Sequence, residues 1–208
     1  MLKTWRRKHK DRERHDSPRR SLRTLDSRRL TLVAATADLV LADLEGTAPL
    51  AALLDARVAD NWPPELYERE PMKYALRQLA DPAEHGWSFW YLLSLDALLP
   101  PADLLNGLEN ERVVMGICGF KGRPDTSGSV EIGYSVLPQF RNLGFATEAV
   151  ERLVSWAFSH QSVSEVCAET LPHLQQSIRV MKKNGFTYTG QGSEQGVVRY
   201  AVQRPDRR

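Results

Sequence analysis

The clearest pattern of apolar and polar positions lies in the second half of the chain. Apolar stretches predict strands over 112–120, 130–137, 163–170, 186–190 and 197–202. A helix running to about His160 is predicted by the apolar stripe Ala149, Val150, Leu153, Val154, Ala157 and Phe158. A second helix is expected over 174–184, with Gly185 ending it. Residues 121–129 hold Gly, Pro and Asp, which predicts a hairpin turn.

The first half is less regular but completes the fold class. Apolar stretches predict strands over 30–33 and 88–95. Helical segments are expected over 37–44 (capped by Thr36), 50–56 and 72–79, and residues 96–111 are expected to form a loop. An antiparallel series of strands followed by strand, helix, strand, helix and two strands is typical of a mixed α/β fold with one crossover.

Charge divides the chain into two parts. Residues 1–29 hold twelve Lys or Arg and four Asp or Glu, although the whole chain of 208 residues carries a net charge of only +2. We therefore expect a basic, disordered extension over residues 1–23 and one domain over 24–208. The extension would be attracted weakly to RNA or a ribosome, or it would simply be solvated.

The remaining composition excludes several classes of protein. No apolar run approaches the ~20 residues that span a bilayer, and no apolar segment follows the basic N-terminus as in a secretory signal. Cys118 and Cys167 lie inside predicted strands, so buried free thiols are expected. No cysteines and histidines have zinc-site spacing. These features favour a soluble cytoplasmic protein without a metal or a membrane contact, either a monomer or a homodimer.

The segment after the strand 130–137 is a candidate phosphate site. A strand, a turn with small residues and a helix N-terminus follow one another here, and Arg141, Gly144 and Ala146 lie in the turn. Proteins use this geometry to bind phosphate through backbone N–H groups. Neither the dinucleotide-binding fingerprint nor the P-loop motif is present. Taken alone, the segment could be a phosphate cradle or a plain turn.

The wider sequence resembles the GCN5-related N-acetyltransferases (GNAT). Arg141 to Ala146 match the family's (Gln/Arg)-x-x-Gly-x-(Gly/Ala) motif. Glu131–Tyr134 resembles the family's fourth strand, and the segments 168–172 and 177–186 resemble its fifth strand and following helix. The resemblance covers about residues 24–203, is strongest over 129–187, and is closest to the branch of ribosomal-protein alanine acetyltransferases.

The resemblance implies a fold and a cofactor. It implies a mostly antiparallel twisted sheet of about seven strands, flanked by helices and splayed between strands 4 and 5, here 130–137 and 163–170. Acetyl-CoA would be the co-substrate, and an amine, on a small molecule or a protein N-terminus, the acceptor. The pyrophosphate would bind Arg141, Asn142, Leu143, Gly144, Phe145 and Ala146, with Thr147 at the helix start. A bulge ending the fourth strand would offer pantetheine the backbone of Ser135, Val136 and Leu137.

Two carboxylates are candidates for the base that this chemistry needs, because an amine is mostly protonated at neutral pH. Glu131 is the first, since strand alternation places it on one face with Gly133 and Ser135. Glu169, near the end of the next strand, is the rival. Either could instead be a solvated or ion-paired surface residue.

The chain departs from the family at two positions. A Tyr that many members use as an acid is Met181 here, and an Asn common in this branch is Leu174. Ser177 is still available to form a hydrogen bond with the departing sulfur. Alternatively, it is simply a residue at the start of a helix. Tyr134 is expected in the core or the pocket wall.

The acceptor itself stays open. Trp62, Tyr67, Trp87, Trp90 and Tyr188 are candidates for lining its pocket, although each could be a core residue. Two alternatives to acetyl transfer to an amine remain: a non-catalytic acyl-CoA-binding module tethered to RNA or a ribosome by its basic arm, and an acyltransferase for a longer acyl group.

Overall fold

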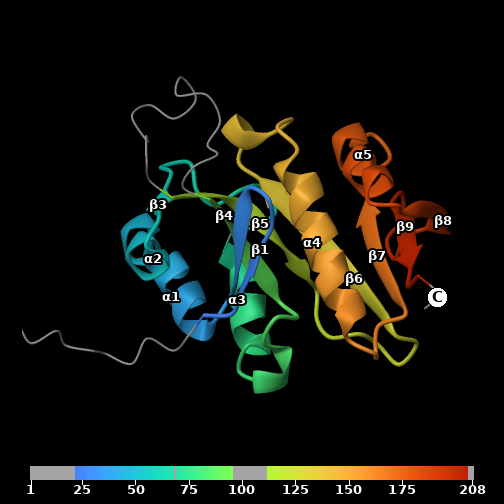
Figure 1. Ribbon diagram of the computed structural model, residues 1–208, viewed down its shortest axis with the longest axis horizontal. Helices are drawn as coiled ribbons and strands as arrows, with labels where there is room; N and C mark the ends of the chain where they lie inside the picture. Colours follow the sequence, from blue (N-terminus) through green and yellow to red (C-terminus); the bar gives the residue numbers. More distant parts are fainter. Residues whose placement is uncertain (1–21, 68, 96–111, 206–208) are drawn as a thin grey trace, which may run out of the picture.

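One twisted sheet organises the residues that the computed structural model describes, 22–67, 69–95 and 112–205 (Figure 1). Its strands are β1 (Thr24–Asp26), β2 (Leu30–Ala34), β3 (Arg57–Val58), β4 (Phe89–Ser94), β5 (Val113–Phe120), β6 (Ser129–Val136), β7 (Glu165–Thr170), β8 (Thr187–Gln191) and β9 (Val198–Gln203). The helices are α1 (Ala37–Glu45), α2 (Thr47–Leu54), α3 (Arg69–Gln78), α4 (Phe145–Ser159) and α5 (Gln175–Lys183). The predicted loop 96–111 and most of the predicted basic extension 1–23 lie outside the described residues.

The sheet confirms the predicted fold class but contains more strands than the seven predicted. Nine strands follow the order β1-β2-β4-β5-β6-β7-β9-β8, with β3 beside β5. The two additional strands, β1 and β3, have only three and two residues. Such short strands carry no recognisable apolar alternation, and they form because a longer neighbour offers backbone partners.

The predicted crossover is the connection from β6 through α4 to β7. These two strands pair in parallel, as β3 and β5 do, whereas the other strand pairs are antiparallel. A parallel pair needs a long connection, and α4 supplies it. The described chain is therefore a mixed, mostly antiparallel α/β fold.

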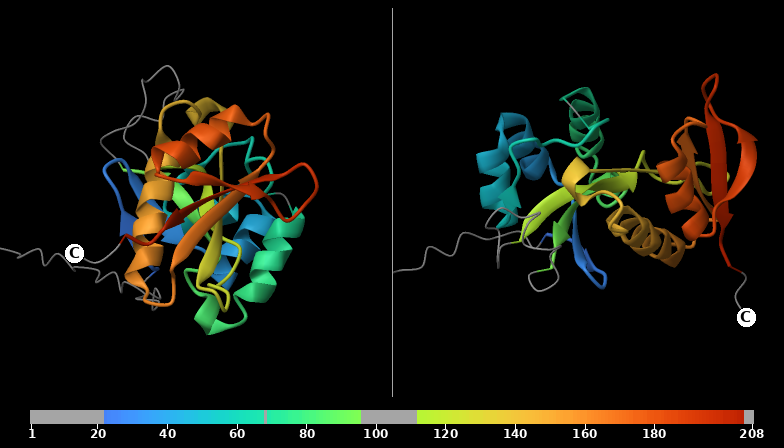
Figure 2. Two further views of the ribbon diagram at one scale, coloured as in Figure 1. Left: turned by 90° about the vertical axis from the view of Figure 1, so that its right-hand side faces the viewer. Right: turned by 90° about the horizontal axis from the view of Figure 1, so that it is seen from above.

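Helices cover both faces of the sheet. Alternation along β2 sends Leu30 and Leu32 into the core beneath α4 and α5, and Val33 into the core beneath α1, α2 and α3. Figure 1 shows α4 crossing in front of the sheet centre, and Figure 2 shows β7, β8, β9 and α5 grouped at one end. The two cores fix the sheet from both sides.

An aromatic cluster surrounds the C-terminal end of α4. The Trp156 ring lies with its centroid 4.7 Å from that of Trp87, 5.5 Å from Trp90, 5.7 Å from Phe120 and 4.4 Å from His160. Trp156 does not belong to the apolar stripe that predicted the helix, yet it is buried in this cluster. The cluster anchors α4 at the end opposite the candidate phosphate loop.

The strand β6 changes partners along its length. Its first three residues, Ser129–Glu131, pair with β7, whereas Ile132–Val136 pair with β5. The register against β5 is continuous over Ile132–Val136, so the bulge expected to offer its backbone to pantetheine is absent from these residues. Beyond Glu131 the strands β6 and β7 diverge, as the predicted splay requires.

The buried carboxylate of Asp43 fixes the segment that precedes α3. Asp43 on α1 accepts hydrogen bonds from the Trp62 indole (2.7 Å) and the Tyr91 hydroxyl (2.9 Å). Burial raises the pKa of Asp43, and the two hydrogen bonds oppose that rise. Asp43 thereby joins α1, β4 and the loop that carries Glu65 and Tyr67.

Asp43→Ala should lower the free energy of unfolding by about 2–4 kcal/mol, because it leaves two buried donors without an acceptor. Urea denaturation followed by circular dichroism would measure the change. Glu45→Ala on the same helix is the control, since Glu45 is exposed and should change stability little. Equal effects of the two substitutions would contradict the structural role of Asp43.

Candidate active site

A cavity of about 1070 Å³ lies where β6 and β7 diverge. One side is lined by residues 140–142 and 144–147 and by α5, and we call this the loop side. The other side is lined by residues 65–67, α3 and parts of β4 and β5, and we call this the α3 side. Because β6 runs between the two sides, a group on either of them can reach the same stretch of strand.

The N-terminus of α4 meets the cavity without a side-chain cap. Gly144 takes the N-cap position with φ of 85°, a left-handed conformation that favours glycine. Within the described residues, no acceptor pairs with the backbone N–H groups of Gly144, Phe145, Ala146 and Thr147, and all four residues line the cavity. These free donors, together with the helix dipole, form a candidate anion-binding site.

Arg141 closes the loop over the end of β6. Its Nε donates to the carbonyl of Val136 (2.9 Å), and its guanidinium lies 3.1 Å from the Glu65 carboxylate. The side chain thus joins the loop side of the cavity to the segment before α3. Its positive charge adds to that of Arg179 and Lys183, which also line the cavity and come from α5.

A network around Glu148 fixes the loop from behind. Its carboxylate accepts hydrogen bonds from the Arg29 backbone (2.6 Å), the Arg29 Nε (2.7 Å) and the Ser27 hydroxyl (2.8 Å). The same guanidinium donates to the Leu143 carbonyl (2.9 Å) and lies over the Phe145 ring. Burial alone would raise the pKa of Glu148, but the hydrogen bonds from Arg29 and Ser27 hold it below 4.5.

The backbone of β6 offers groups to the gap. The Leu137 N–H donates to Met115 on β5, whereas the Val136 carbonyl points the other way and accepts from Arg141. Alternation therefore directs the backbone of Tyr134 and Val136 towards the gap. Eight of the ten predicted cofactor residues line the cavity; Leu137 is buried beneath it, and Leu143 packs against the core.

Ser177 and Tyr134 meet across the gap. The Tyr134 hydroxyl donates to the Ser177 carbonyl (2.9 Å) and lies 3.1 Å from the Ser177 hydroxyl. Burial raises the pKa of Tyr134 to about 12, although the hydrogen bond to Ser177 opposes the rise. Met181, one turn further along α5, is fully buried, and Leu174 precedes the helix without capping it.

Glu131 lies on the opposite face of β6 from Tyr134. Its carboxylate is 2.5 Å from the Lys121 ammonium, and its side chain is 24% exposed. Within the described residues, Lys121 is the only partner of this carboxylate, so the second oxygen is available to a ligand. Glu131 is therefore ion-paired, which was one of the two alternatives that the sequence left open, and it also lines the cavity.

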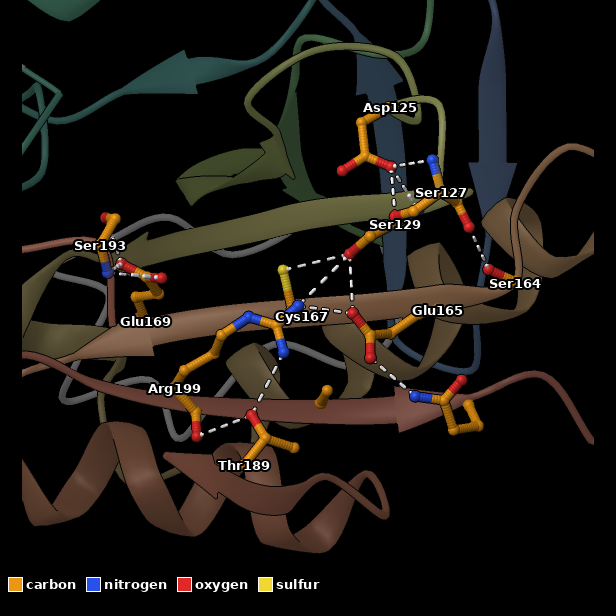
Figure 3. A network of polar contacts seen from close by, with 12 residues as sticks. Asp125, Ser127, Ser129, Ser164, Glu165, Cys167, Glu169, Thr189, Ser193 and Arg199 are labelled. Carbon is orange, nitrogen blue, oxygen red and sulfur yellow. Dashed lines mark hydrogen bonds and ion pairs between the residues drawn. The ribbon is translucent and has the colours of Figure 1, made fainter. Parts of the chain in front are cut away.

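Glu169 also lines the cavity, but both its oxygens are occupied. They accept hydrogen bonds from the Ser193 backbone (3.0 Å each), and one also accepts from its hydroxyl (2.6 Å) (Figure 3). Burial alone would raise the pKa of Glu169, but these bonds lower it below 4.5, helped by the charges of Lys121 and Arg199.

A polar network covers the same face of the sheet beside Glu169. Glu165 accepts from Ser129 (2.7 Å), Arg199 (2.5 Å) and Gln203 (2.6 Å), and this group shields the buried Cys167 thiol (Figure 3). Both cysteines are free and buried, as predicted. The network joins β6, β7 and β9 on the face that α4 and α5 do not cover.

Comparison with known proteins decides the family. The model of the acetyltransferase (GNAT) domain matches residues 29–187. The chain belongs to the GNAT family. This confirms the family predicted from the loop motif and its flanking strands.

Individual GNAT relatives match shorter segments. An uncharacterized N-acetyltransferase of Bacillus subtilis, YjdG, is 32% identical over 39% of this chain and 48% of its own length. The FsC-acetyl coenzyme A-N(2)-transacetylase of Aspergillus fumigatus is 31% identical over 36% of this chain and 37% of its own length. The chain thus spans less than half the length of these curated relatives.

Solved structures share the GNAT fold along most of the chain. RimL, a ribosomal L7/L12 alpha-N-protein acetyltransferase, is 17% identical with a TM-score of 0.58, over 88% of this chain and 94% of RimL. The ribosomal-protein-S5-alanine acetyltransferase of Vibrio fischeri is 14% identical with a TM-score of 0.57, over 88% of this chain and 98% of that one. At these identities the likeness establishes the fold.

Some residues that line the cavity were not identified from the sequence, and others that were assigned to the pocket lie elsewhere. Arg179 and Lys183 were not singled out, although their spacing on one helix could have suggested a cationic face. Of the five proposed pocket aromatics, only Tyr67 lines the cavity. Trp87 and Trp90 are buried in the core, Trp62 packs between the two cores, and Tyr188 is exposed beside Tyr200.

The described residues of the domain contain no group of three or more His, Cys, Asp or Glu that could hold a metal ion. In the same residues, each helix is too short or too polar to cross a bilayer.

Glu148→Gln should lower the free energy of unfolding by about 1–2 kcal/mol at neutral pH, because it removes a charged acceptor of three hydrogen bonds. The folded-state pKa of Glu148 lies below its ordinary value of 4.5. The charged form therefore stabilises the wild type above that pH, and the advantage is lost as the pH falls through the folded-state pKa.

Urea denaturation at neutral pH and again below the folded-state pKa of Glu148 would measure both effects. Glu151→Gln is the matched control, because Glu151 is exposed on the same helix. A difference between wild type and Glu148→Gln that stays constant at acidic pH would contradict this account of the ion pair.

Proposed function

We propose that this GNAT domain is an N-acetyltransferase that transfers the acetyl group of acetyl-CoA directly to a primary amine, with both substrates bound together. The observation that carries the proposal is the cavity at the β6–β7 gap. It holds the free amides of α4 on its loop side and the Glu131 carboxylate on its α3 side. The site thus has an anion-binding end and a proton-accepting end.

The residues present fit acetyl-CoA. The free amides of 144–147 suit a pyrophosphate, and Arg141, Arg179 and Lys183 supply positive charge around them. The backbone of Tyr134 and Val136 faces the gap where an extended pantetheine arm would pair, whereas that of the predicted Ser135 and Leu137 is turned to β5. Bound acetyl-CoA supplies the acetyl group as a thioester whose sulfur is the leaving group.

Glu131 would accept the proton of the acceptor amine, directly or through water. One of its oxygens pairs with Lys121, and the second has no partner among the described residues. Glu169 remains the rival, but Ser193 occupies its oxygens and the pKa of its carboxyl is lowered. Both properties make Glu169 the weaker base.

Ser177 would donate a hydrogen bond to the departing sulfur. Tyr134 holds the first turn of α5 at the gap, so the Ser177 hydroxyl stays close to β6. Met181 has no proton to donate, and a thiol with a pKa of ~8.5 needs little help to leave. The backbone N–H of Tyr134 faces the gap, where it can stabilise negative charge on the carbonyl oxygen.

The transfer itself is tested by mixing the protein with acetyl-CoA and a panel of amines, peptides and ribosomal proteins. We expect at least one acceptor to release free CoA faster than the control without acceptor, and mass spectrometry should find an acetyl group on it. Binding of CoA by calorimetry without release for any acceptor would contradict the proposal and favour a non-catalytic binding module.

Glu131→Gln should lower kcat by about a hundredfold or more, because general-base catalysis contributes roughly 10²–10⁴ in rate. The Kd for acetyl-CoA should not change. Steady-state kinetics and calorimetry would measure the two quantities, with Glu151→Gln as control and Glu169→Gln as the rival. If Glu169→Gln lost the activity and Glu131→Gln kept it, the base would be Glu169.

A further inference from the structure

Tyr67 lies on the α3 side of the cavity, in the segment just before α3. Its ring packs edge-on against Phe89, with centroids 6.0 Å apart. Its hydroxyl points at β6, where it is 3.4 Å from the place that a Cβ on Gly133 would occupy. The ring is thus held by the core beneath α3, while the polar end reaches the strand that borders the gap.

Gly133 leaves room at this point of β6. It lies between Glu131 and Ser135 on the same face of the strand, and each of the three residues lines the cavity. Any other residue at 133 would place a side chain between the Tyr67 hydroxyl and the strand. Because Gly133 has no side chain, a small space remains beside the hydroxyl. Glu131, two residues earlier on the same face of β6, is the neighbouring side chain.

The Tyr67 hydroxyl has no hydrogen-bond partner within the described part of the chain. The residue is half-buried, and a phenol that lines a cavity normally pairs with water or a ligand. Burial raises the pKa of Tyr67 well above its ordinary value of 10, so the hydroxyl stays protonated at neutral pH. It offers one O–H donor and an oxygen that accepts from N–H groups.

We propose that the Tyr67 hydroxyl binds the acceptor amine and holds its nitrogen above Gly133, beside Glu131. This inference rests on the proposed N-acetyltransferase function and names the residue that receives the second substrate. The Tyr67 oxygen accepts one N–H of the amine, and Glu131 takes the proton that the amine must lose.

This arrangement leaves the nitrogen lone pair free to point into the gap. The amine approaches from the α3 side, and the anion-binding amides lie on the loop side, so the two substrates meet from opposite faces of β6. Tyr67 suits this task because its ring is fixed against Phe89, and a fixed group orients a ligand at little cost in entropy.

Tyr67→Phe tests the proposal, because it removes the oxygen and keeps the ring. We expect kcat/KM for the acceptor to fall about tenfold to hundredfold, mainly through a higher KM. The Kd for acetyl-CoA and the melting temperature should stay at their wild-type values. Tyr188→Phe is the matched control, since Tyr188 is an exposed tyrosine on β8 that does not line the cavity.

Gly133→Ala provides a second test that keeps the hydroxyl. The new methyl group would lie 3.4 Å from the Tyr67 oxygen, an ordinary contact that the fold should tolerate. It fills the space assigned to the amine, so kcat/KM for the acceptor should fall while the affinity for acetyl-CoA is kept.

The outcomes separate this inference from the proposed function. An active wild type whose kcat/KM for the acceptor is unchanged in Tyr67→Phe overturns the role of Tyr67 and leaves the acetyltransferase function intact. A loss of acetyl-CoA affinity or of thermal stability in Tyr67→Phe overturns it as well, because the tyrosine would then be structural. A wild type that transfers to no amine overturns the proposed function and, with it, this inference.

Discussion

The site depends on the change of partner that β6 makes at Glu131. A strand that stayed paired with β7 along its whole length would leave no gap, and its backbone groups would all be used within the sheet. Because the pairing with β7 stops after three residues, the backbone of Tyr134 and Val136 becomes available to a ligand. The same divergence lets a residue on either face of β6 reach one cavity, so the sheet's irregularity creates the place where two substrates can meet.

The loop side of the cavity is held by contacts from distant parts of the chain. Arg29, in the turn before β2, binds both Glu148 and the Leu143 carbonyl. At the same N-terminal end of α4, Asn184, the residue after α5, donates to the Thr147 carbonyl. Free amides at a helix start bind anions well only when the helix cannot shift, and these contacts, with the aromatic cluster around Trp156, fix it.

The regular elements and the loop motif could be predicted from the sequence because both are local. Apolar periodicity located α4 and β5 to within a residue or two, and the Arg141–Ala146 motif predicted the turn before α4 as a candidate phosphate-binding loop. The contacts of the two candidate bases could not be predicted in this way. The ion pair of Glu131 with Lys121 depends on the conformation of the hairpin between β5 and β6. The hydrogen bonds of Glu169 with Ser193 depend on the turn between β8 and β9. The positions of the aromatic residues were predicted poorly. The sequence around Trp87 and Tyr67 does not show which ring is buried in the core and which lines the cavity, because that depends on how the sheet and helices pack.

The aromatic cluster at the end of α4 also makes the intrinsic tryptophan fluorescence of the protein a probe of its structure. Three of the five tryptophans lie there, because Trp87 and Trp90 both pack against Trp156, together with His160. Trp62 lies apart, beside Tyr91 and close to the segment before α3. The emission of the described tryptophans therefore comes from two separate environments: one depends on how α4 packs on the sheet, and the other on how the segment before α3 is held by Asp43.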